Sequence, residues 1–397
     1  MTSGEADVID LTAVRADTPG AAERVFLDSA GSSLPPRPVL DEVIGHLRRE
    51  AEIGGYVAAR ERADDLEAGY GVFAELLGAH PDEVAFTDSA TRSWLAAFDA
   101  VPLGKGDRVL VTEVEYAGNA IPILHRAQEV GAEVLTIPSD AVGQVDVEAL
   151  KDLLDERVKL VSLVHAPTNG GLVNPVREVA SAAHEAGALV LLDACQSMGQ
   201  LPVRADDLDV DIISATGRKW LRGPRGTGVL VVRRTAADRL RPRLVDLHSA
   251  EWVGPDEVEL RSDARVYELW ETSVADRLGL IAAARYALDL GIDQITAEVR
   301  ARAEHLRTGL RALPGVEVRD IGAELSGIVT FTVEGHDAVA VRDHLARHDV
   351  VATSSHLSST RIDMTRRRIE GLVRMSPHYF VSPDQLDRAV EAVAALT

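Results

Sequence analysis

Val210-Asp211-Ile212-Ile213-Ser214-Ala215-Thr216-Gly217-Arg218-Lys219-Trp220 is the stretch that decides how this 397-residue chain folds. Its apolar, β-branched start predicts a buried strand, and the small residues that follow place Lys219 just past the end of that strand. A second apolar run, Ala188–Leu192, is followed directly by Asp193, which lies 26 positions before the lysine. The sequence therefore predicts a lysine and an acid, each at the end of a buried strand.

This pair of residues suits the chemistry of pyridoxal 5′-phosphate. A lysine amine forms a Schiff base with this cofactor, and a carboxylate keeps the pyridine nitrogen protonated, so that the ring can accept electrons from a carbanion. We therefore predict an enzyme that uses this cofactor, with Lys219 and Asp193 as catalytic residues. The alternatives are a solvated lysine and an acid that only caps a helix.

Short apolar runs alternate with amphipathic helical patterns through most of the chain, which predicts an α/β fold with a mainly parallel sheet between helices. Ligands of such sheets bind beyond the carboxyl ends of the strands. The predicted strands are Glu83–Thr87, Arg108–Thr112, Glu133–Ile137, Val158–Val164, Ala188–Leu192, Val210–Ala215 and Gly228–Val232. The predicted helices between them include Asn119–Val130, Val147–Asp155 and Pro175–Ala186.

A second, smaller α+β unit is predicted from about residue 275 to the end of the chain. We expect a large cofactor-binding domain at 21–274, a small C-terminal domain at 275–397, and the segment 1–20 packed on the small domain. The predicted helices of the small domain are Ala275–Leu290, Ile295–Leu313, Ala338–Arg347 and Pro383–Ala395. Its predicted strands are Val316–Arg319, Gly327–Val333, Val350–Thr353 and Gly371–Ser376.

The composition indicates which partners and which cellular compartment to expect. The chain has 42 basic and 63 acidic residues, a net charge of −21, which disfavours nucleic acid and anionic membranes as partners. Cys195 is the single cysteine, so no intramolecular disulfide can form and a reducing compartment is expected. Met1–Asp7 lacks the features of a signal peptide, and no apolar run reaches 18 residues. We expect a cytoplasmic protein without a membrane span.

Five clusters with polar side chains follow the predicted strand ends in order along one sheet. A helix start suits a phosphate, an aromatic residue can lie on a cofactor ring, and polar side chains can bond the ring nitrogen or the ring hydroxyl. Taken singly, each could also be a helix cap or a plain loop residue. The predicted cofactor-binding residues are Ser89, Ala90, Thr91, Tyr116, Thr168, Asp193, Gln196, Thr216, Arg218 and Lys219.

Other candidates carry less weight. Arg374, at a predicted strand end of the small domain, could pair with a substrate carboxylate or form a surface salt bridge. Gly223–Gly228 precedes a strand, so it is not a dinucleotide fingerprint. His344 and His348 share a helix face, but the sequence places no third ligand beside them, so we predict no metal. We interpret Cys195 as a packing residue beneath the ring.

Together these clusters resemble the class V aminotransferase-like family, whose members have the fold-type I architecture of pyridoxal phosphate enzymes. The match runs from about Phe26 to the C-terminus and includes Asp193-x-x-Gln196, Lys219 with Gly223-Pro224-x-Gly226-x-Gly228, and Arg374. The resemblance implies a homodimer with the site at the subunit interface, ring stacking by Tyr116 and carboxylate binding by Arg374. Arg218–Gly226 and Glu50–Tyr56 look most like the isopenicillin N epimerase-like and hercynylcysteine sulfoxide lyase-like branch.

The chain departs from the cysteine desulfurases of this family. They usually have His at the position of Tyr116, Asn at that of Thr168 and His at that of Arg218. They also carry a nucleophilic cysteine on a late loop, whereas the corresponding segment here, Thr353–Thr360, contains none. Persulfide chemistry by that route is therefore excluded. The neighbouring subunit's phosphate contact would fall at 268–273, where Trp270-Glu271-Thr272 replaces the usual Gly-Thr pair, so no residue is assigned to it.

The favoured hypothesis is a C–S β-lyase that removes the Cα proton of an L-cysteine S-conjugate. A thiol, pyruvate and ammonia would be released, in secondary-metabolite or thiol biosynthesis. An aminotransferase, an epimerase and a decarboxylating oxidative deaminase share the first carbanion, so they stay open as alternatives. The lyase preference rests on the branch resemblance alone. A non-enzymatic cofactor-binding protein and a nucleotide-binding dehydrogenase fit the residues less well.

Overall fold

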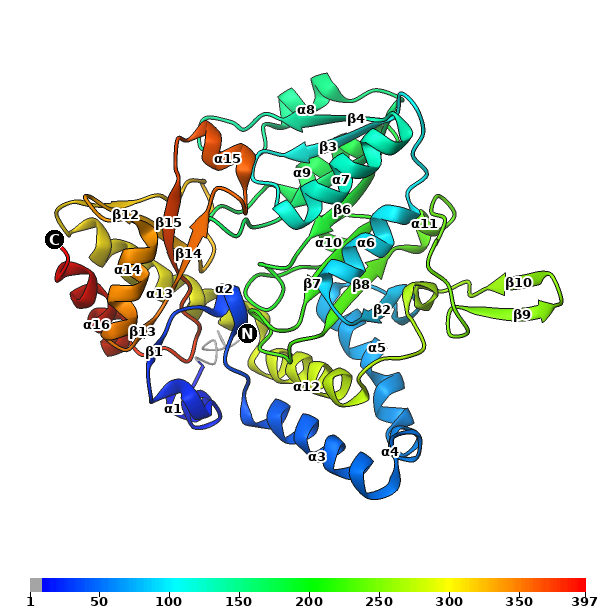
Figure 1. The fold of residues 1–397 in the computed structure, drawn as a ribbon, viewed down its shortest axis with the longest axis horizontal. Helices are drawn as coiled ribbons and strands as arrows, with labels where there is room; N and C mark the ends of the chain where they lie inside the picture. The colour runs from blue at the N-terminus through cyan, green and yellow to red at the C-terminus, as the bar shows by residue number, and fades with distance from the viewer. Residues whose placement is uncertain (1–8) are drawn as a thin grey trace, which may run out of the picture.

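A computed structural model describes residues 9–397, and its centre is a seven-stranded sheet (Figure 1). The strand order is β2-β8-β7-β6-β5-β3-β4. Neighbours from β7 through β4 are parallel, whereas β8 runs antiparallel to both β7 and β2. The strands are β2 (Val84–Thr87), β3 (Arg108–Thr112), β4 (Glu133–Ile137), β5 (Val158–Val164), β6 (Leu189–Asp193), β7 (Ile212–Thr216) and β8 (Gly228–Val232).

The predicted α/β fold class is confirmed, and so are the seven predicted strands of this sheet. Four of them, β3, β4, β5 and β8, have the predicted bounds, and the other three differ by one or two residues at their ends. Their β-branched, apolar composition reflects burial on both faces, which parallel strands between helices require. The strands hold the candidate residues at one edge of the sheet.

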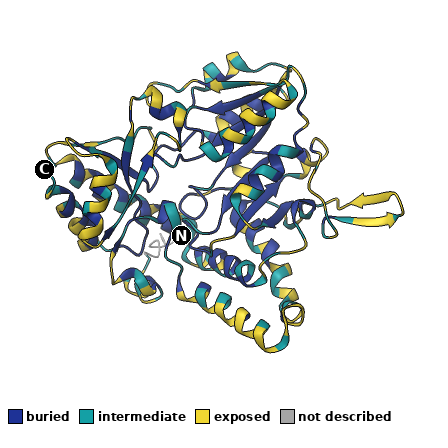
Figure 2. Ribbon diagram, viewed as in Figure 1, coloured by how far each residue is buried: buried dark blue, intermediate teal, exposed yellow. Residues whose placement is uncertain are grey.

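Alternate residues of the strands pack on opposite helix layers. Val109 and Val111 of β3 belong to a core with α6 and α7, whereas Leu110 belongs to a core with α5, α9 and α12. This follows from the two-residue repeat of a strand, which points successive side chains to opposite faces. Figure 2 shows the sheet as the most continuously buried part of the molecule. The large-sheet helices are α5 (Ala63–Leu77), α6 (Ala90–Ala100), α7 (Ala117–Val130), α8 (Val147–Leu153), α9 (Val176–Glu185), α10 (Ala205–Leu208), α11 (Arg234–Ala237) and α12 (Val274–Leu290).

A four-stranded antiparallel sheet with the order β11-β12-β15-β14 forms the second unit. Its strands are β11 (Val316–Val318), β12 (Val329–Val333), β14 (Thr353–His356) and β15 (Gly371–Met375). Its helices are α13 (Ile292–Arg311), α14 (Ala338–Arg347), α15 (Arg361–Arg366) and α16 (Pro383–Ala394). The single strand predicted at Val350–Thr353 is wrong. It is divided between β13 (Val350–Val351), which pairs with β1 (Val25–Phe26), and β14, so the late segment expected as a loop begins as a strand.

The described N-terminal residues contact the C-terminal helix. In α1 (Leu11–Ala16), Arg15 donates to the carbonyl of Phe380 at 2.9 Å and to Oε1 of Gln385 at 2.6 Å. The predictions made for Met1–Asp7 lie outside the described residues. α2 (Ser29–Ser32), α3 (Arg37–Ile53) and α4 (Gly55–Glu61) complete the N-terminal part.

The β9–β10 hairpin has no counterpart among the predicted elements. β9 (Ala250–Gly254) and β10 (Glu257–Leu260) form a ribbon that extends away from the body of the molecule (Figure 1). Both strands are largely exposed, and the ribbon is drawn almost wholly in the exposed colour in Figure 2. β10 alternates polar and apolar residues over only four positions, Glu257–Leu260, and this short pattern was not included among the predicted strands.

Among the described helices, none combines the length and the apolar character needed to cross a membrane.

Candidate active site

All ten residues predicted to bind a cofactor line one pocket at the carboxyl edge of the large sheet. The structure brings them together from five separate strand ends, as the parallel order of the strands requires. The pocket is lined by Ser89, Ala90, Thr91, Trp94, Tyr116, Gly118, Asn119, Val164, Ala166, Thr168, Asp193, Cys195, Gln196, Ser214, Thr216, Arg218 and Lys219.

Lys219 lies three residues beyond the end of β7, in the turn before Gly223. Burial lowers the pKa of its ammonium group; Cys195 and Asp193 oppose this shift, and Arg218 and Arg374 reinforce it. A lowered pKa increases the fraction of neutral amine at neutral pH, and the neutral amine is the form that attacks a carbonyl or accepts a proton. The position thus gives a lysine that is more reactive than a solvated one.

Asp193 is the last residue of β6, and two hydrogen bonds fix its carboxylate. Oδ1 accepts from the backbone N–H of Cys195 at 2.9 Å, and Oδ2 accepts from Nδ2 of Asn119 at 2.8 Å. The side chain is only 7% exposed yet still lines the pocket. A carboxylate held in this way can present a negative charge to one fixed point of a bound molecule.

The start of α6 offers backbone donors to an anion. Oγ of Ser89, the N-cap, accepts from the backbone N–H of Arg92 at 3.1 Å. Within residues 9–397, the N–H groups of Ala90 and Thr91 have no acceptor. Free N–H groups and the positive end of a helix dipole are what a phosphate binds.

Gly228 explains how close the neighbouring strand comes to this helix start. A Cβ built on Gly228 would lie 2.4 Å from the carbonyl carbon of Ser89 and 2.6 Å from the backbone nitrogen of Ala90. Only a residue without a side chain allows such an approach. Gly228 therefore allows β8 to pack closely against the start of α6, where the anion would bind. It is not part of a dinucleotide fingerprint.

Gln196 and Thr168 are joined by a hydrogen-bond chain that begins at Trp220. The indole N–H of Trp220 donates to Oε1 of Gln196 at 3.0 Å, which turns Nε2 of Gln196 toward Oγ1 of Thr168 at 3.3 Å. Trp220 is 1% exposed, so its orientation is set by packing. The donor end of the Gln196 amide consequently faces the pocket region.

Arg374, on β15, reaches the same region from the small sheet. Its Nη1 donates to Oγ1 of Thr168 at 2.7 Å, and its Nη2 donates to Oδ1 of Asp28 at 2.9 Å. Its Nε is buried without a hydrogen-bond partner within residues 9–397. A buried guanidinium N–H without an acceptor is costly, so this group is a candidate to donate to a carboxylate oxygen that enters the site. The surface salt bridge weighed as an alternative does not describe this buried arginine.

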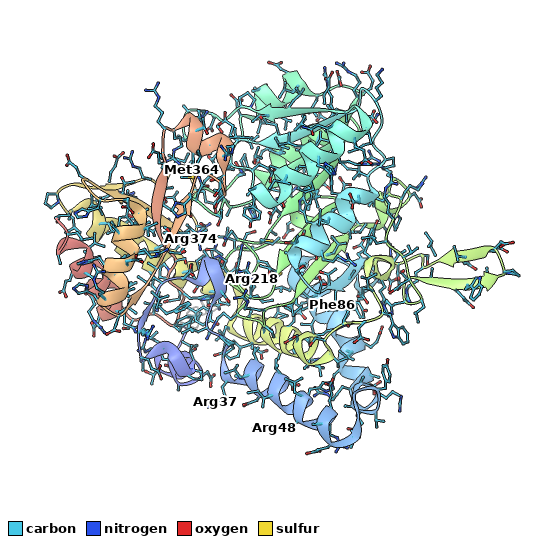
Figure 3. All side chains as sticks on the ribbon, in the orientation of Figure 1. Arg37, Arg48, Phe86, Arg218, Met364 and Arg374 are labelled. Atoms are coloured by element: carbon cyan, nitrogen blue, oxygen red, sulfur yellow. The ribbon has the colours of Figure 1, made fainter. Side chains whose placement is uncertain are left out.

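The remaining predicted residues are placed as follows. Tyr116 is the N-cap of α7, 44% exposed, and its ring borders the pocket. Oγ1 of Thr216 donates to the carbonyl of Thr227 at 3.4 Å. The guanidinium of Arg218 donates to the carbonyl of Gly31, so it is partly engaged by the protein itself. Figure 3 shows Arg218 and Arg374 on different segments of the chain.

The sequence analysis missed three residues of this site. Asn119 bonds Asp193, Glu115 bonds Asn119 at 2.9 Å, and Asp28 bonds Arg374. The sequence carries no distinguishing signal for the first two, because Glu115 precedes the N-cap of α7 and Asn119 lies in its first turn, where acids and amides are common. Asp28 gave no signal either, since its partner is 346 positions away.

The candidates that carried less weight lie outside the pocket, or line it without an assigned role in the chemistry. His344 and His348 bond the backbone carbonyls of Ala392 and His344, and no cluster of three or more possible metal ligands occurs in the described part of the chain. Cys195 lines the pocket, and burial, followed by the charge of Asp193, raises the pKa of its thiol well above the usual range. The backbone N–H of Trp270 bonds Asp246 at 2.8 Å.

With this geometry in place, residues 25–389 match the family described as aminotransferase class V. The chain belongs to the aminotransferase class V family. Enzymes of this family depend on pyridoxal phosphate, so the predicted cofactor and the prediction of an enzyme are confirmed. The finer assignment to one branch of the family is not decided by this match.

Curated relatives of two kinds are similar over nearly the whole chain. A probable cysteine desulfurase 2 of Mycobacterium leprae is 31% identical, with 97% of this chain and 96% of the relative covered. A probable hercynylcysteine sulfoxide lyase of Mycobacterium tuberculosis is also 31% identical, with 94% and 90% covered. A cysteine desulfurase of Haloferax volcanii is 28% identical over all of this chain and 99% of the relative.

Solved structures share the fold. The cysteine desulfurase CsdA from Escherichia coli superposes with a TM-score of 0.90 at 24% identity, covering 98% of both chains. The cystine C–S lyase C-DES, in complex with its product cysteine persulfide, superposes with a TM-score of 0.86 at 23% identity, covering 95% of this chain and 99% of that one. These likenesses confirm the predicted fold-type I architecture.

Proposed function

We propose that this protein is a pyridoxal 5′-phosphate-dependent C–S lyase that cleaves a cysteine S-conjugate by β-elimination. The observation that carries the proposal is the position of the only cysteine. Cys195 lies inside the pocket, next to Asp193, and the segment Thr353–Thr360 has no cysteine. The chain therefore has the pocket of this family without a thiol on the late segment to receive sulfur.

The residues of the pocket fit pyridoxal phosphate, because backbone N–H groups beside it have no acceptor within residues 9–397. The free N–H groups of Ala90 and Thr91 would hold the phosphate, together with Ser89, Thr216 and Arg218. Tyr116 would lie on the ring, and Asp193 would face its nitrogen. Gln196 and Thr168 would bond the ring hydroxyl, and Lys219 would carry the Schiff base.

When bound, the cofactor supplies an electron sink for a carbanion at Cα. Nζ of Lys219 would take the Cα proton, a task that its lowered pKa favours. The carboxylate of Asp193 would hold a proton on the ring nitrogen, and its two hydrogen bonds would keep it aimed there. The Cβ–S bond then breaks, its electron pair leaves with sulfur, and water completes the conversion to a thiol, pyruvate and ammonia.

Arg374 would bind the α-carboxylate of the amino acid. It is 6% exposed, and its Nε lacks a partner among the described residues, so an incoming carboxylate would satisfy a buried donor. Asp28 and Thr168 would hold the guanidinium in place. An amino acid is therefore the proposed substrate class, and neither nucleic acid nor a membrane is a proposed partner.

The proposed assembly is a homodimer, with 268–273 near the neighbouring subunit's site. Its support is the resemblance to the family, and several large apolar side chains are exposed and available to such an interface. They include Leu47, Tyr56, Leu247, Trp252 and Trp270. We also propose the division into a large domain at 21–274 and a small domain at 275–397, with the N-terminal segment packed on the latter. In this division α12, the helix predicted to open the small domain, packs against α3 and α5 of the large one.

The hercynylcysteine sulfoxide lyase-like branch and a cytoplasmic role in thiol or secondary-metabolite biosynthesis are part of this proposal. The similarity to the M. tuberculosis relative supports the branch. The single cysteine, which cannot form an intramolecular disulfide, supports a reducing compartment.

Product analysis tests the proposed reaction. The purified enzyme would be incubated with a panel of L-cysteine S-conjugates, and keto acids, thiols and the configuration of the remaining substrate would be measured. We expect pyruvate and the intact thiol in equal amounts. A keto acid that retains the side group would show transamination, and the D-isomer of the substrate would show epimerisation; either as the main product contradicts the proposal.

A cysteine desulfurase is the second candidate, favoured by the named desulfurase relatives and by the presence of Cys195 in the pocket. Its products would be alanine and a persulfide on Cys195. The raised pKa of this thiol opposes the role, because the thiolate is the nucleophile.

A further inference from the structure

Glu115 is a buried acid in direct contact with the site, and the mechanism above gives it no role. It directly precedes Tyr116 and is 2% exposed. Its Oε1 accepts from Nδ2 of Asn119 at 2.9 Å and from the backbone N–H of Tyr116 at 3.0 Å. Its Oε2 lies 2.9 Å from Oγ of Ser162.

Asn119 joins this acid to Asp193. The same Nδ2 atom lies 2.9 Å from Glu115 and 2.8 Å from Asp193, so one NH₂ group donates one hydrogen to each carboxyl. Asn119 is itself 5% exposed. Two carboxyl groups thus lie within hydrogen-bonding distance of a single nitrogen in a buried place, where two negative charges would repel each other strongly.

The surroundings decide which of the two groups stays charged. Within residues 9–397, no lysine, arginine or histidine forms an ion pair with Glu115, and the charged group that faces it is Asp193. Asp193 is close enough to Lys219 for its charge to act on that amine. The positive neighbour therefore lies on the Asp193 side of the pair, and Glu115 has only dipoles around it.

We infer that Glu115 is a positioning residue kept as the neutral acid, so that the negative charge of the pair rests on Asp193 and Asn119 holds that carboxylate in place. The inference rests on the proposed function, because it concerns the group that would face the ring nitrogen. The hydrogen bonds allow it: Oε1 accepts both N–H groups, and the acid proton on Oε2 can point to Oγ of Ser162. Burial, and the charge of Asp193, raise the pKa of Glu115 to about 8, which agrees with a neutral group at pH 7.

Infrared spectroscopy of the full-length chain tests the protonation directly, without any measurement of activity. The carbonyl stretch of a neutral carboxylic acid is expected at neutral pH in the wild type, and it should fade as the pH passes about 8. Glu115→Gln should lose this signal. Asp193→Asn should make it fade at a lower pH, because the charge of Asp193 contributes to the raised pKa of Glu115. Glu268→Gln, at a second glutamate that is 2% exposed, should leave it unchanged.

Three results would overturn the inference: no such signal in the wild type, its survival in Glu115→Gln, or an unchanged fading pH in Asp193→Asn. The titration of the wild type needs no variant, so a folding defect cannot hide the answer. A second readout concerns position. Glu115→Gln, which copies the neutral acid, should retain at least tenfold more turnover than Glu115→Ala, and equal losses in the two variants would contradict a positioning role. Failure of the lyase proposal would appear in the products and leave the infrared result intact.

Discussion

Two buried glutamates, Glu115 in the active site and Glu268 near the base of the β9–β10 hairpin, have the same exposure and opposite electrostatic surroundings. Each is 2% exposed. Glu268 accepts from the hydroxyl of Tyr70, from the backbone N–H of Phe86 at 2.7 Å and from His248 at 2.9 Å, and Arg277 lies 3.8 Å away. Burial works against the charged form, but these partners outweigh it and lower the pKa of Glu268.

The difference teaches that burial alone does not fix the charge of an acid; the nearest ionisable partner does. Glu268 has two basic neighbours, whereas the neighbour of Glu115 is the carboxylate of Asp193. In the first network, basic groups balance the charge of Glu268, which suits a structural role. In the second, no basic group forms an ion pair with Glu115 within residues 9–397, and the acid lies beside Asp193 at the edge of the site.

The largest effect is expected on turnover, from a change in the active site rather than in the Glu268 network. Lys219→Ala should abolish turnover and the visible absorbance of the lysine-bound cofactor, because no other amine replaces Nζ. The free energy of unfolding should change little. Absorbance, turnover and denaturant unfolding would be measured together; full activity in this variant would remove Lys219 from the mechanism.

Asp193→Asn should lower turnover by about two orders of magnitude or more while some cofactor binding remains. A neutral amide cannot hold the ring nitrogen protonated. Steady-state kinetics and cofactor titration provide the measurement, with Asp211→Asn, at the residue just before β7, as a control for a general folding effect. Near-normal rates in Asp193→Asn would show that its carboxylate is not needed as a charge.

Glu268→Gln should act on stability instead. The amide leaves His248 and Arg277 without their anion, and we expect a loss of about 3 kcal/mol in the free energy of unfolding at neutral pH. Guanidinium unfolding of the wild type and the variant would measure it. A stability equal to that of the wild type would mean that the Glu268 network contributes nothing as an ion pair.

Glu115→Gln should change how stability depends on pH. The pKa of Glu115 in the folded chain, about 8, lies above the ordinary value of 4.5, so the folded state binds one more proton than the unfolded state between these values. Wild-type stability should therefore fall as the pH rises through this window, by up to about 1.4 kcal/mol per pH unit from this group. In Glu115→Gln that contribution should disappear.

Unfolding titrations from pH 5 to pH 8 on both proteins would measure the difference. Parallel curves for wild type and Glu115→Gln would contradict the comparison between the two glutamates.

The sequence was sufficient to predict most of the sheet and ten of the residues that line the pocket. Continuous apolar runs such as Val158–Val164 leave little choice of structure when both faces of a strand are buried. Because parallel strands end at one edge, residues that follow their ends converge. The order of the clusters along the chain therefore carried spatial information that no single cluster had.

What could not be predicted depends on contacts between distant parts of the chain. β1 pairs with β13, and Asp28 meets Arg374, through packing that has no local signature. The roles of Asn119 and Glu115 were hidden for another reason. An acid and an amide at the start of a helix are ordinary capping residues, and only their burial beside Asp193 distinguishes them.

Cys195→Ala tests the central claim, that sulfur leaves with its own side group and not through a protein thiol. Wild type and variant would each receive an L-cysteine S-conjugate, and pyruvate, alanine, free thiol and enzyme-bound persulfide would be quantified together. We expect pyruvate and the intact thiol in equal amounts from both proteins, with largely unchanged rates and no persulfide. Alanine together with a persulfide on Cys195 in the wild type, both lost in the variant, would contradict this account and make the protein a desulfurase.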